Sequence, residues 1–483
     1  MGEPCGAPLA PAPQNEPAAA PSLPLFPDPA GLDADLLAFL QQASDQLCRW
    51  WGGSSQRSPL PLLSVLPEVA PAEAGLDSLA LLDDLQLVMD GAFNPVHPGS
   101  MAHLDPPPLT ASVAADLICA GLNNNLLAEE LSPSLSRLER GLCAWMAERL
   151  GLGDQAGGVA ASGGSLSNLM ALVVARQQRQ LVGAQDALVF CSADAHVSIA
   201  KALAVMGLPL SALRSVAVDG RGCLQVDHLV AQLDAAIAAG QPVLAVVATA
   251  GTTVRGAIDP LDQVAQICRA RQIWLHVDGA IGAVFGLSSS HAGLVQGLGL
   301  ADSLTVNPQK LLGITKTSSL LLLRQPDALA SCFATGLPYM EPSWAEAHGG
   351  ECGLQGTRPA EVLKLWLGLR QLGLNGIEQV LSGAIERRHQ LQALLEPLPL
   401  ELRSGPLHLL AFTPQHLSAA EAELWSQQTR HRLLERQLML SRPLYQGRHH
   451  LKAVLGNPHT GAAEIEAVAE VVAASLPASL PLR

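Results

Sequence analysis

Residues 243–278 read VLAVVATAGTTVRGAIDPLDQVAQICRARQIWLHVD. The stretch begins and ends with short apolar runs, 243–248 and 273–277, whose length and β-branched content are typical of buried strands. Between them, residues 261–271 have the apolar spacing of a helix. A strand, a helix and a second strand in this order predict two parallel strands joined by a crossover helix.

The same alternation continues on both sides of this stretch. Further strand-like runs lie at 187–191, 304–306 and 320–323, and a helical pattern covers 166–179. The predicted fold class is therefore α/β with a mostly parallel sheet. Such sheets bind ligands at the carboxyl ends of their strands, so the residues that follow each strand are the first candidates for a site.

The ends of the chain differ from its middle. Residues 1–30 are rich in Pro and Ala and poor in charge, which predicts a disordered tail. Apolar spacing then predicts a helical segment within 31–105, followed by the large α/β domain at 106–358. More charge and a long helical pattern from 359 onward predict a smaller C-terminal α+β domain at 359–483.

Composition narrows the class of protein. The 483 residues carry a formal net charge of −14 at pH 7, a field that repels polyanions, so we expect no nucleic-acid partner. The nine cysteines are scattered without a CxxC pair, which indicates neither a zinc site nor a disulfide framework. We expect a reduced, cytoplasmic protein without a bound metal. The sequence contains no signal-peptide pattern and no apolar run of membrane-spanning length, so no membrane partner is expected.

The motif Asn307-Pro308-Gln309-Lys310-Leu311-Leu312 follows one of the strand-like runs. Lys310 lies in an apolar neighbourhood, and desolvation lowers the pKa of a lysine and makes its amine a competent nucleophile for a carbonyl. The alternative, a solvated surface lysine, fits the flanking Leu and Ile residues poorly. The motif therefore predicts a lysine that bonds to an aldehyde cofactor such as pyridoxal 5'-phosphate (PLP).

Two further motifs fit such a cofactor. The run Ser162-Gly163-Gly164-Ser165 precedes an apolar helix, whose N-terminus offers N–H donors and partial positive charge to a phosphate. The alternative is an ordinary glycine turn. Asp278 ends a strand-like run, where a carboxylate can keep a pyridine nitrogen protonated and make the ring an electron sink. The alternative here is a carboxylate that caps a helix.

A histidine and a hydroxyl-rich loop complete the set. His196, in Ala195-His196-Val197-Ser198, is able to stack on a planar ring or to move a proton, with a satisfied loop histidine as the alternative. The loop Thr249-Ala250-Gly251-Thr252-Thr253 offers hydroxyl groups to a cofactor, with turn and cap chemistry as the alternative.

In this order the motifs resemble the group II PLP-dependent amino-acid decarboxylases, which include glutamate, cysteine-sulfinate, diaminobutyrate and aromatic-amino-acid decarboxylases. The resemblance extends from Asn94-Pro95-Val96-His97-Pro98 to Gly456-Asn457-Pro458. It implies PLP fold type I, the aspartate-aminotransferase-like architecture. It also implies a homodimer in which residues 31–105 are the dimerisation segment and Arg358 lies near the subunit interface.

The resemblance implies a role for each candidate catalytic residue. Lys310 is expected to hold PLP covalently, Asp278 to pair with the pyridine nitrogen, and His196 to stack on the ring. Tyr339 falls in a segment similar to the family's mobile catalytic loop, and either Tyr339 or His196 is expected to protonate the carbon that loses CO2.

Further residues fall where the family contacts the cofactor. The phosphate is expected to be bound by Gly164, Ser165 and Asn307. The cofactor ring is expected to be lined by Thr253 and Ala280.

The chain departs from the family at four positions. Gln309 stands where the family usually has His, Leu311 where many members have Trp, and Leu166 where a polar residue is common. Lys452 lies near the place where the glutamate branch has an arginine that meets the substrate carboxylate, and lysine offers a point charge instead of a two-pronged donor.

The resulting prediction is a PLP-dependent carboxy-lyase that removes CO2 from a small, non-aromatic L-amino acid and releases an amine. The candidate substrates are 2,4-diaminobutyrate, glutamate, aspartate and cysteine sulfinate. One alternative is a PLP enzyme of altered reaction, either a lyase or an aldehyde-forming enzyme. Another is a PLP-fold regulatory protein with little activity, which the changes at Gln309 and Leu166 would suit.

Overall fold

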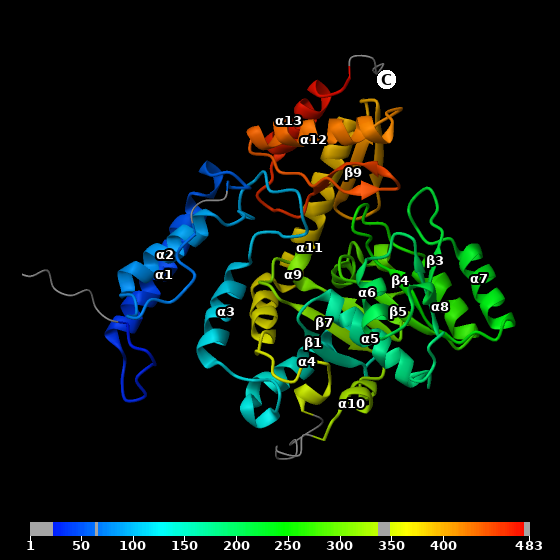
Figure 1. Ribbon diagram of the computed structural model, residues 1–483, viewed down its shortest axis with the longest axis horizontal. Helices are drawn as coiled ribbons and strands as arrows, with labels where there is room; N and C mark the ends of the chain where they lie inside the picture. Colours follow the sequence, from blue (N-terminus) through cyan, green and yellow to red (C-terminus); the bar gives the residue numbers. More distant parts are fainter. Residues whose placement is uncertain (1–22, 63–65, 337–347, 478–483) are drawn as a thin grey trace, which may run out of the picture. The chain divides into compact units, whose positions relative to one another are not determined.

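The chain divides into two units, Met1–Asn94 and Pro95–Arg483. The computed structural model describes residues 23–62, 66–336 and 348–477 (Figure 1). In the first unit, helices α1 (Ala34–Gly52) and α2 (Ser78–Asp90) each begin after an aspartate whose carboxylate accepts a hydrogen bond from the helix start. The two helices contact each other through Gln46, whose Nε2 donates to the Leu82 carbonyl at 2.9 Å.

The second unit is built around a seven-stranded sheet with the order β1-β7-β6-β5-β4-β2-β3. Strand β7 is antiparallel to both of its neighbours, and the β2–β3, β2–β4, β4–β5 and β5–β6 pairs are parallel. The prediction of a mostly parallel α/β sheet is confirmed. The strands are β1 (Gly157–Ala161), β2 (Leu188–Ser192), β3 (Leu213–Val216), β4 (Val243–Thr249), β5 (Trp274–Gly279), β6 (Ser303–Val306) and β7 (Ser319–Leu323).

Every strand-like run seen in the sequence corresponds to one of these strands, but β1 and β3 were not predicted. Strand β1 reads GGVAA and β3 reads LRSV, so neither has the continuous apolar content of a buried strand. Strand β1 forms because it pairs with β7 along its whole length, from Gly157 opposite Leu323 to Ala161 opposite Ser319. Its formation depends on a partner distant in the sequence.

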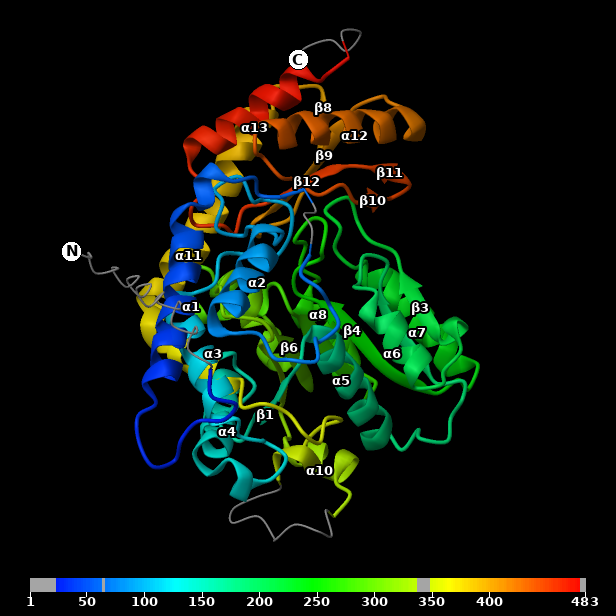
Figure 2. The same cartoon turned by 60° about the vertical axis from the view of Figure 1, so that its left-hand side comes forward.

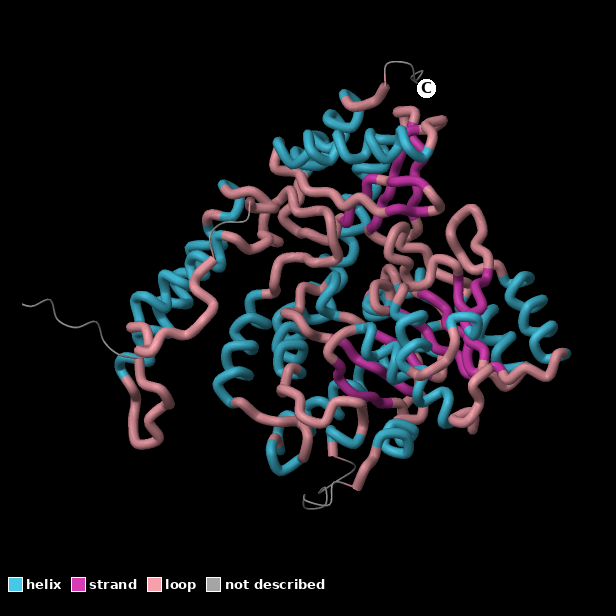
Figure 3. The backbone as a smooth tube through the Cα atoms, viewed as in Figure 1, coloured by secondary structure: helices cyan, strands magenta, loops and turns pink. Residues whose placement is uncertain are grey.

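Helices cover both faces of the large sheet, as Figure 3 shows. Alternate side chains of a strand point to opposite faces, so Val246 and Val247 of β4 belong to different core clusters. The Val246 face packs against α4 (Pro133–Arg149), α7 (Val226–Ala238), α8 (Leu261–Ala270) and α11 (Val362–Leu395). The opposite face packs against α5 (Gly164–Gln178), α6 (Ser198–Val205) and α10 (Asp327–Phe333).

A smaller antiparallel sheet with the order β12-β9-β8 follows in the C-terminal part. Its strands are β8 (Leu400–Ser404), β9 (Leu409–Pro414) and β12 (Leu451–Val454). Helices α12 (Ala419–Glu435) and α13 (Ala462–Ala474) lie together beside this sheet in both views (Figures 1 and 2). A short hairpin joins β10 (Leu444–Tyr445) to β11 (Arg448–His449).

Helix α11 connects the two sheets. Leu365 and Leu381 pack in the core of the large sheet, whereas Leu391 and Leu395 pack in the core of the small one. Gly373 interrupts the helix with φ 57° and ψ 178°, a conformation that favours glycine. Helix α3 (Thr110–Leu122) packs along α11. None of the described helices combines the length and apolar content that crossing a lipid bilayer requires.

Candidate active site

A cavity of about 410 Å³ lies where strands β1, β2, β4, β5 and β6 end. Each of these strands contributes residues from its carboxyl end or from the loop that follows, as expected for a doubly covered α/β sheet. The lining includes all eight residues predicted to contact the cofactor: Gly164, Ser165, His196, Thr253, Asp278, Ala280, Asn307 and Lys310. Of the predicted catalytic residues, Tyr339 lies outside the described residues.

One end of the cavity is formed by the start of α5. The N-cap residue Gly163 has φ 133° and no side chain of its own to cap the helix, so the partial positive charge of the helix start faces this end of the cavity. One orientation of the Asn307 amide gives both its oxygen and its nitrogen a hydrogen-bond partner. In this orientation, Asn307 Oδ1 accepts from the Gly164 N–H at 3.2 Å and Asn307 Nδ2 donates to Ser319 Oγ at 2.7 Å. A Cβ on Gly164 would lie 2.9 Å from the nearer end of the Asn307 amide, so only glycine leaves this arrangement undisturbed.

Asp278 is the second-last residue of β5, and its side chain is buried with both oxygens hydrogen-bonded. Oδ2 accepts from Asn168 Nδ2 at 2.9 Å, and Oδ1 accepts from the Ala280 N–H at 3.1 Å. In the sheet register, Asp278 pairs with Thr249 on one side and with Thr305 on the other. Two N–H groups therefore donate to this carboxylate, one to each oxygen.

His196 follows β2 and contacts the start of α6. Its Nδ1 lies 2.9 Å from Ser198 Oγ and 3.2 Å from the Ser198 backbone nitrogen. Burial lowers the pKa of His196 below its ordinary value of 6.5, although the nearby Asp278 carboxylate acts in the opposite direction. The imidazole is therefore neutral near pH 7.

Lys310 lies in the short helix α9 (Pro308–Leu311), directly after β6. Its side chain is partly accessible because it lines the cavity, yet protein atoms surround it. Burial lowers the pKa of Lys310 below 10.5, and the charges of Asp278 and Asp105 act in the opposite direction. A lowered pKa leaves a larger fraction of the amine unprotonated, as attack on an aldehyde requires.

The loop after β4 is contacted by a residue of the small sheet. Lys452, in β12, donates from Nζ to the Thr253 carbonyl oxygen at 3.2 Å. Burial, and secondly the charge of Lys310, lower the pKa of Lys452 to about 8. Thr249 Oγ1 also lines this side of the cavity, and it is buried without a hydrogen-bond partner in the described part of the chain.

The unusual Gln309 has a defined structural contact. Its Oε1 accepts a hydrogen bond from the Ser318 backbone N–H at 2.5 Å, which joins the helix containing Lys310 to the start of β7. Leu311 is buried, and Leu166 lines the cavity. The departures from the family pattern are thus compatible with an intact cavity.

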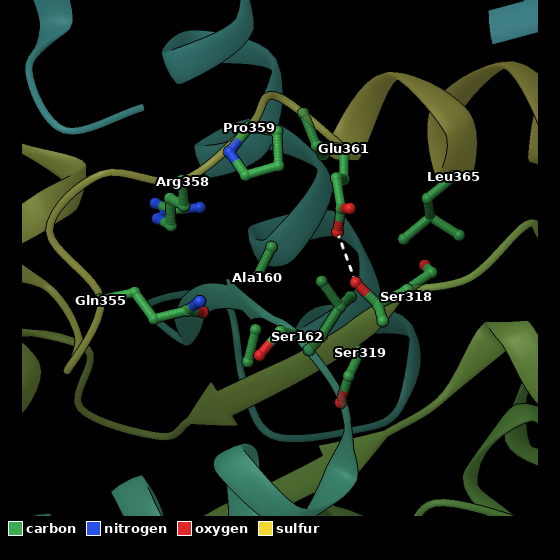
Figure 4. A pocket seen from close by; sticks show the side chains of 13 residues that line it. Ala160, Ser162, Ser318, Ser319, Gln355, Arg358, Pro359, Glu361 and Leu365 are labelled. Atoms are coloured by element: carbon green, nitrogen blue, oxygen red, sulfur yellow. Dashed lines mark hydrogen bonds between the residues drawn. The ribbon is translucent and has the colours of Figure 1, made fainter. Parts of the chain in front are cut away.

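A second, smaller cavity of about 70 Å³ shares Ser162 with the first (Figure 4). Thr317 Oγ1 donates to Glu361 Oε2 at 2.7 Å on one side of it. Arg358, on the opposite side, donates to both carboxylate oxygens of Glu139 at 2.6 and 2.7 Å, and both side chains are buried. Arg358 therefore has an internal partner, whatever its position relative to a second subunit.

Asn168 is the residue of this site that the sequence analysis missed. It lies on α5, lines the cavity, and makes hydrogen bonds to Asp278 and Ser198. The available signal was an amide side chain directly before the apolar run 169–175 of the helix pattern. A buried amide in such a position needs polar partners, and these come from strands far away in the sequence.

The residues present fit PLP. The cavity volume is in the range of small-molecule sites, and the start of α5 suits a phosphate. The unpartnered Thr249 hydroxyl is a buried polar atom that a bound ligand would satisfy. Asp278 and Lys310 supply a carboxylate for a pyridinium nitrogen and an amine for an aldehyde, the two groups that PLP requires of a protein.

Comparison with known proteins agrees with this chemistry. The model of the pyridoxal-dependent decarboxylase conserved domain matches residues 59–401. An L-2,4-diaminobutyrate decarboxylase of Rhizobium meliloti is 31% identical over 82% of this chain and 81% of its own length. An aromatic-L-amino-acid decarboxylase of Bacillus atrophaeus is 32% identical over 69% of this chain and 70% of its own. The crystal structure of mouse CSAD in apo form superimposes with a TM-score of 0.83 at 25% identity, covering 90% of this chain and 98% of that one.

Proposed function

Because this chain belongs to the pyridoxal-dependent decarboxylase family, we propose that it removes CO2 from a small, non-aromatic L-amino acid. The chain is a PLP-dependent amino-acid decarboxylase and hence a carboxy-lyase. The identity of the substrate is what we propose here. We expect the enzyme to prefer the acidic amino acids glutamate, aspartate and cysteine sulfinate to 2,4-diaminobutyrate.

The observation that carries this choice is the buried ammonium group of Lys452 beside the cavity loop. The charge of this ammonium group favours an anionic substrate side chain over a cationic one. The lining supports the same choice, because within the described ranges it consists largely of Gly, Ser, Thr and Asn and contains no Phe, Tyr or Trp. Such a surface suits a small polar side chain better than an indole or phenol ring.

Each residue of the site has a proposed task. The start of α5, with Gly164, Ser165 and Asn307, would hold the phosphate, and Lys310 would hold the aldehyde end through its amine. When bound, PLP supplies an electron sink for the electron pair that remains after CO2 leaves.

The remaining residues act around the cofactor ring. Asp278 would keep a proton on the ring nitrogen, because a buried carboxylate with both oxygens fixed favours an adjacent positive charge. His196 would pack against the ring, with Thr253 and Ala280 along its edge. Tyr339 or His196 would deliver the proton to the carbon that loses CO2.

Release of CO2 from a panel of amino acids tests the substrate. Purified enzyme with added PLP would be given glutamate, aspartate, cysteine sulfinate, 2,4-diaminobutyrate, tryptophan and tyrosine in turn. We expect CO2 from an acidic substrate, loss of this activity in Lys310→Ala, and wild-type activity in Lys201→Ala, a lysine that does not line the cavity. CO2 from 2,4-diaminobutyrate or an aromatic substrate alone would contradict the preference, and CO2 from none would favour an altered reaction or a regulatory role.

We further propose that the enzyme is a homodimer. Helices α1 and α2 support this, because both have large exposed apolar side chains, among them Leu37, Leu40, Leu79 and Leu85. Light scattering of the purified full chain would measure the mass, and a monomer would contradict the proposal. A cytoplasmic location and the absence of nucleic-acid and membrane partners remain predictions.

A further inference from the structure

The two cavity residues Asp278 and His196 are connected through Asn168 and Ser198. Asn168 Nδ2 lies 2.9 Å from Asp278 Oδ2 and 2.9 Å from Ser198 Oγ, and Ser198 in turn contacts His196 Nδ1. We propose that Asn168 and Ser198 are positioning residues that fix the proton of the neutral His196 ring on Nε2. The catalytic consequence of this inference rests on the proposed function, but the proton position itself does not.

The orientation of the Asn168 amide is determined by its four partners. An ionised Asp278 carboxylate only accepts hydrogen bonds, so the amide nitrogen, which only donates, must face it. On the other side, Asn168 Oδ1 accepts from Thr305 Oγ1 at 2.7 Å and contacts His276 Nε2 at 3.0 Å. The reversed amide would place its oxygen against the carboxylate and would lose these bonds.

His276 is fixed in the same way from the far end of the network. Trp274 Nε1, which only donates, bonds to Ser303 Oγ at 2.9 Å. The Ser303 hydroxyl proton is then directed to His276 Nδ1, 2.9 Å away, and the ring must donate from Nε2 to Asn168. Complete burial lowers the pKa of His276 to about 4, which agrees with a neutral ring.

The same reasoning determines the His196 tautomer. Ser198 Oγ accepts one proton from Asn168 Nδ2, so its own hydroxyl proton is free to point to His196 Nδ1. Independently, the Ser198 backbone N–H donates to the same Nδ1 at 3.2 Å, and a backbone N–H cannot accept. Nδ1 is thus an acceptor on two grounds, and the single proton of the neutral ring lies on Nε2.

This assignment has a consequence for the cavity. No hydrogen bond joins His196 Nε2 to any other residue in the described part of the chain, so the N–H of this nitrogen is left for a ligand. The network therefore presents a hydrogen-bond donor on His196 and an ionised carboxylate on Asp278 at the same time. Asn168 and Ser198 are both 1% exposed, and such burial keeps these two side chains in fixed positions.

Nitrogen-15 NMR of the histidine-labelled apoprotein tests the tautomer without any turnover. The His196 signals would be identified by their absence in His196→Gln. We expect a protonated Nε2 and an unprotonated Nδ1 in the wild-type protein. This result does not depend on whether a variant folds. A proton on Nδ1 in the wild type would overturn the proposal, even if the enzyme proves to be an active decarboxylase.

A pair of Ser198 variants tests the link to catalysis. Ser198→Ala removes one of the two donors to His196 Nδ1, and we expect a mixture of tautomers and a fall in kcat/KM of about 10- to 100-fold. The apparent Kd for PLP should change less than about threefold, because Ser198 does not line the cavity. Ser198→Thr restores a hydroxyl group and should restore the tautomer, and Ser331→Ala, on the distant α10, serves as the matched control.

Unchanged His196 signals and unchanged kcat/KM in Ser198→Ala would also overturn the proposal. If no variant or wild-type protein releases CO2, the NMR result still decides the tautomer. Failure of the proposed function and failure of this inference are therefore distinguishable.

Discussion

Lys452 and Thr253 join the two sheets at the cavity: the lysine Nζ, on β12 of the small sheet, donates to the Thr253 carbonyl oxygen, after β4 of the large one, at 3.2 Å. This contact brings a buried cation to the loop that lines the site. Because the pKa of Lys452 is lowered only to about 8, the group is still mostly charged at neutral pH.

Substituting Lys452 should weaken binding of an acidic substrate. A hydrogen bond between charged groups contributes about 1.5–3 kcal/mol, so we expect Lys452→Met to raise KM by roughly 10- to 100-fold. Lys452→Arg keeps the charge and should retain most of the affinity. In the wild type, KM should rise as the pH passes about 8, where Lys452 loses its proton, and a steady-state pH series would measure this. Equal KM values for the Met and Arg variants would contradict a role for the charge.

A methyl group at the start of α5 should disturb cofactor binding. In Gly164→Ala, the new Cβ would lie 2.9 Å from the nearer end of the Asn307 amide and displace the group that contacts the helix start. Overpacking of this kind costs about 1–3 kcal/mol, so we expect the Kd for PLP to increase by roughly 10- to 100-fold in a fluorescence titration. Gly183→Ala is the matched control, because nothing lies within 4 Å of a Cβ at that position. Equal affinities in the two variants would rule out a phosphate site at this helix.

Removing one partner of the buried Arg358–Glu139 ion pair should lower the free energy of unfolding. Arg358→Met leaves the Glu139 carboxylate buried without its partner, and we expect a loss of about 3–5 kcal/mol in the free energy of unfolding of the apoprotein. The double variant Arg358→Met/Glu139→Leu removes both charges and should be more stable than the single one. Urea denaturation measures both values, and a double variant less stable than Arg358→Met would contradict a purely structural pair.

His408 should make the fold sensitive to acid. Burial lowers its pKa from 6.5 to about 3, and its ring stacks on Phe285 with the centroids 6.3 Å apart. The unfolded chain takes up a proton below pH 6.5, whereas the folded protein does so only near pH 3, so stability falls as the pH drops through this window.

Replacing His408 with Phe keeps an aromatic ring against Phe285 and removes the titrating group. We expect the pH dependence of the unfolding free energy in this window to become shallower by about 1.4 kcal/mol per pH unit. The exposed His389, replaced in the same way, should leave the slope unchanged. Urea denaturation across the window provides the measurement, and equal slopes for wild type and His408→Phe would refute the assignment.

Much of the fold could be predicted because its central strands are continuous apolar runs. Strand β4, buried at every position, is visible in the sequence for this reason. The direction of β7 cannot be predicted from the sequence, because an apolar run such as Ser319–Leu323 is compatible with either strand orientation. Its antiparallel place between β1 and β6 depends on pairing with strands that the local sequence does not specify.

The site could be predicted where a residue's chemistry is unusual for its position. Lys310 in an apolar stretch and Asp278 at the end of a strand are such residues, and the cavity brings them together. Asn168 was missed because its importance comes from its partners. Its amide connects four groups on helix α6 and strands β5 and β6, and only the folded chain brings these groups within hydrogen-bond distance.

The most direct test asks which lysine holds PLP. The chain contains five lysines, Lys201, Lys310, Lys316, Lys364 and Lys452, so reduction with borohydride in the presence of PLP, followed by peptide mass spectrometry, gives an unambiguous assignment. We predict a single pyridoxyl adduct on the peptide that contains Lys310, and none in Lys310→Ala. An adduct on Lys452 or another lysine instead, or no adduct in the wild type, would contradict the proposed active site.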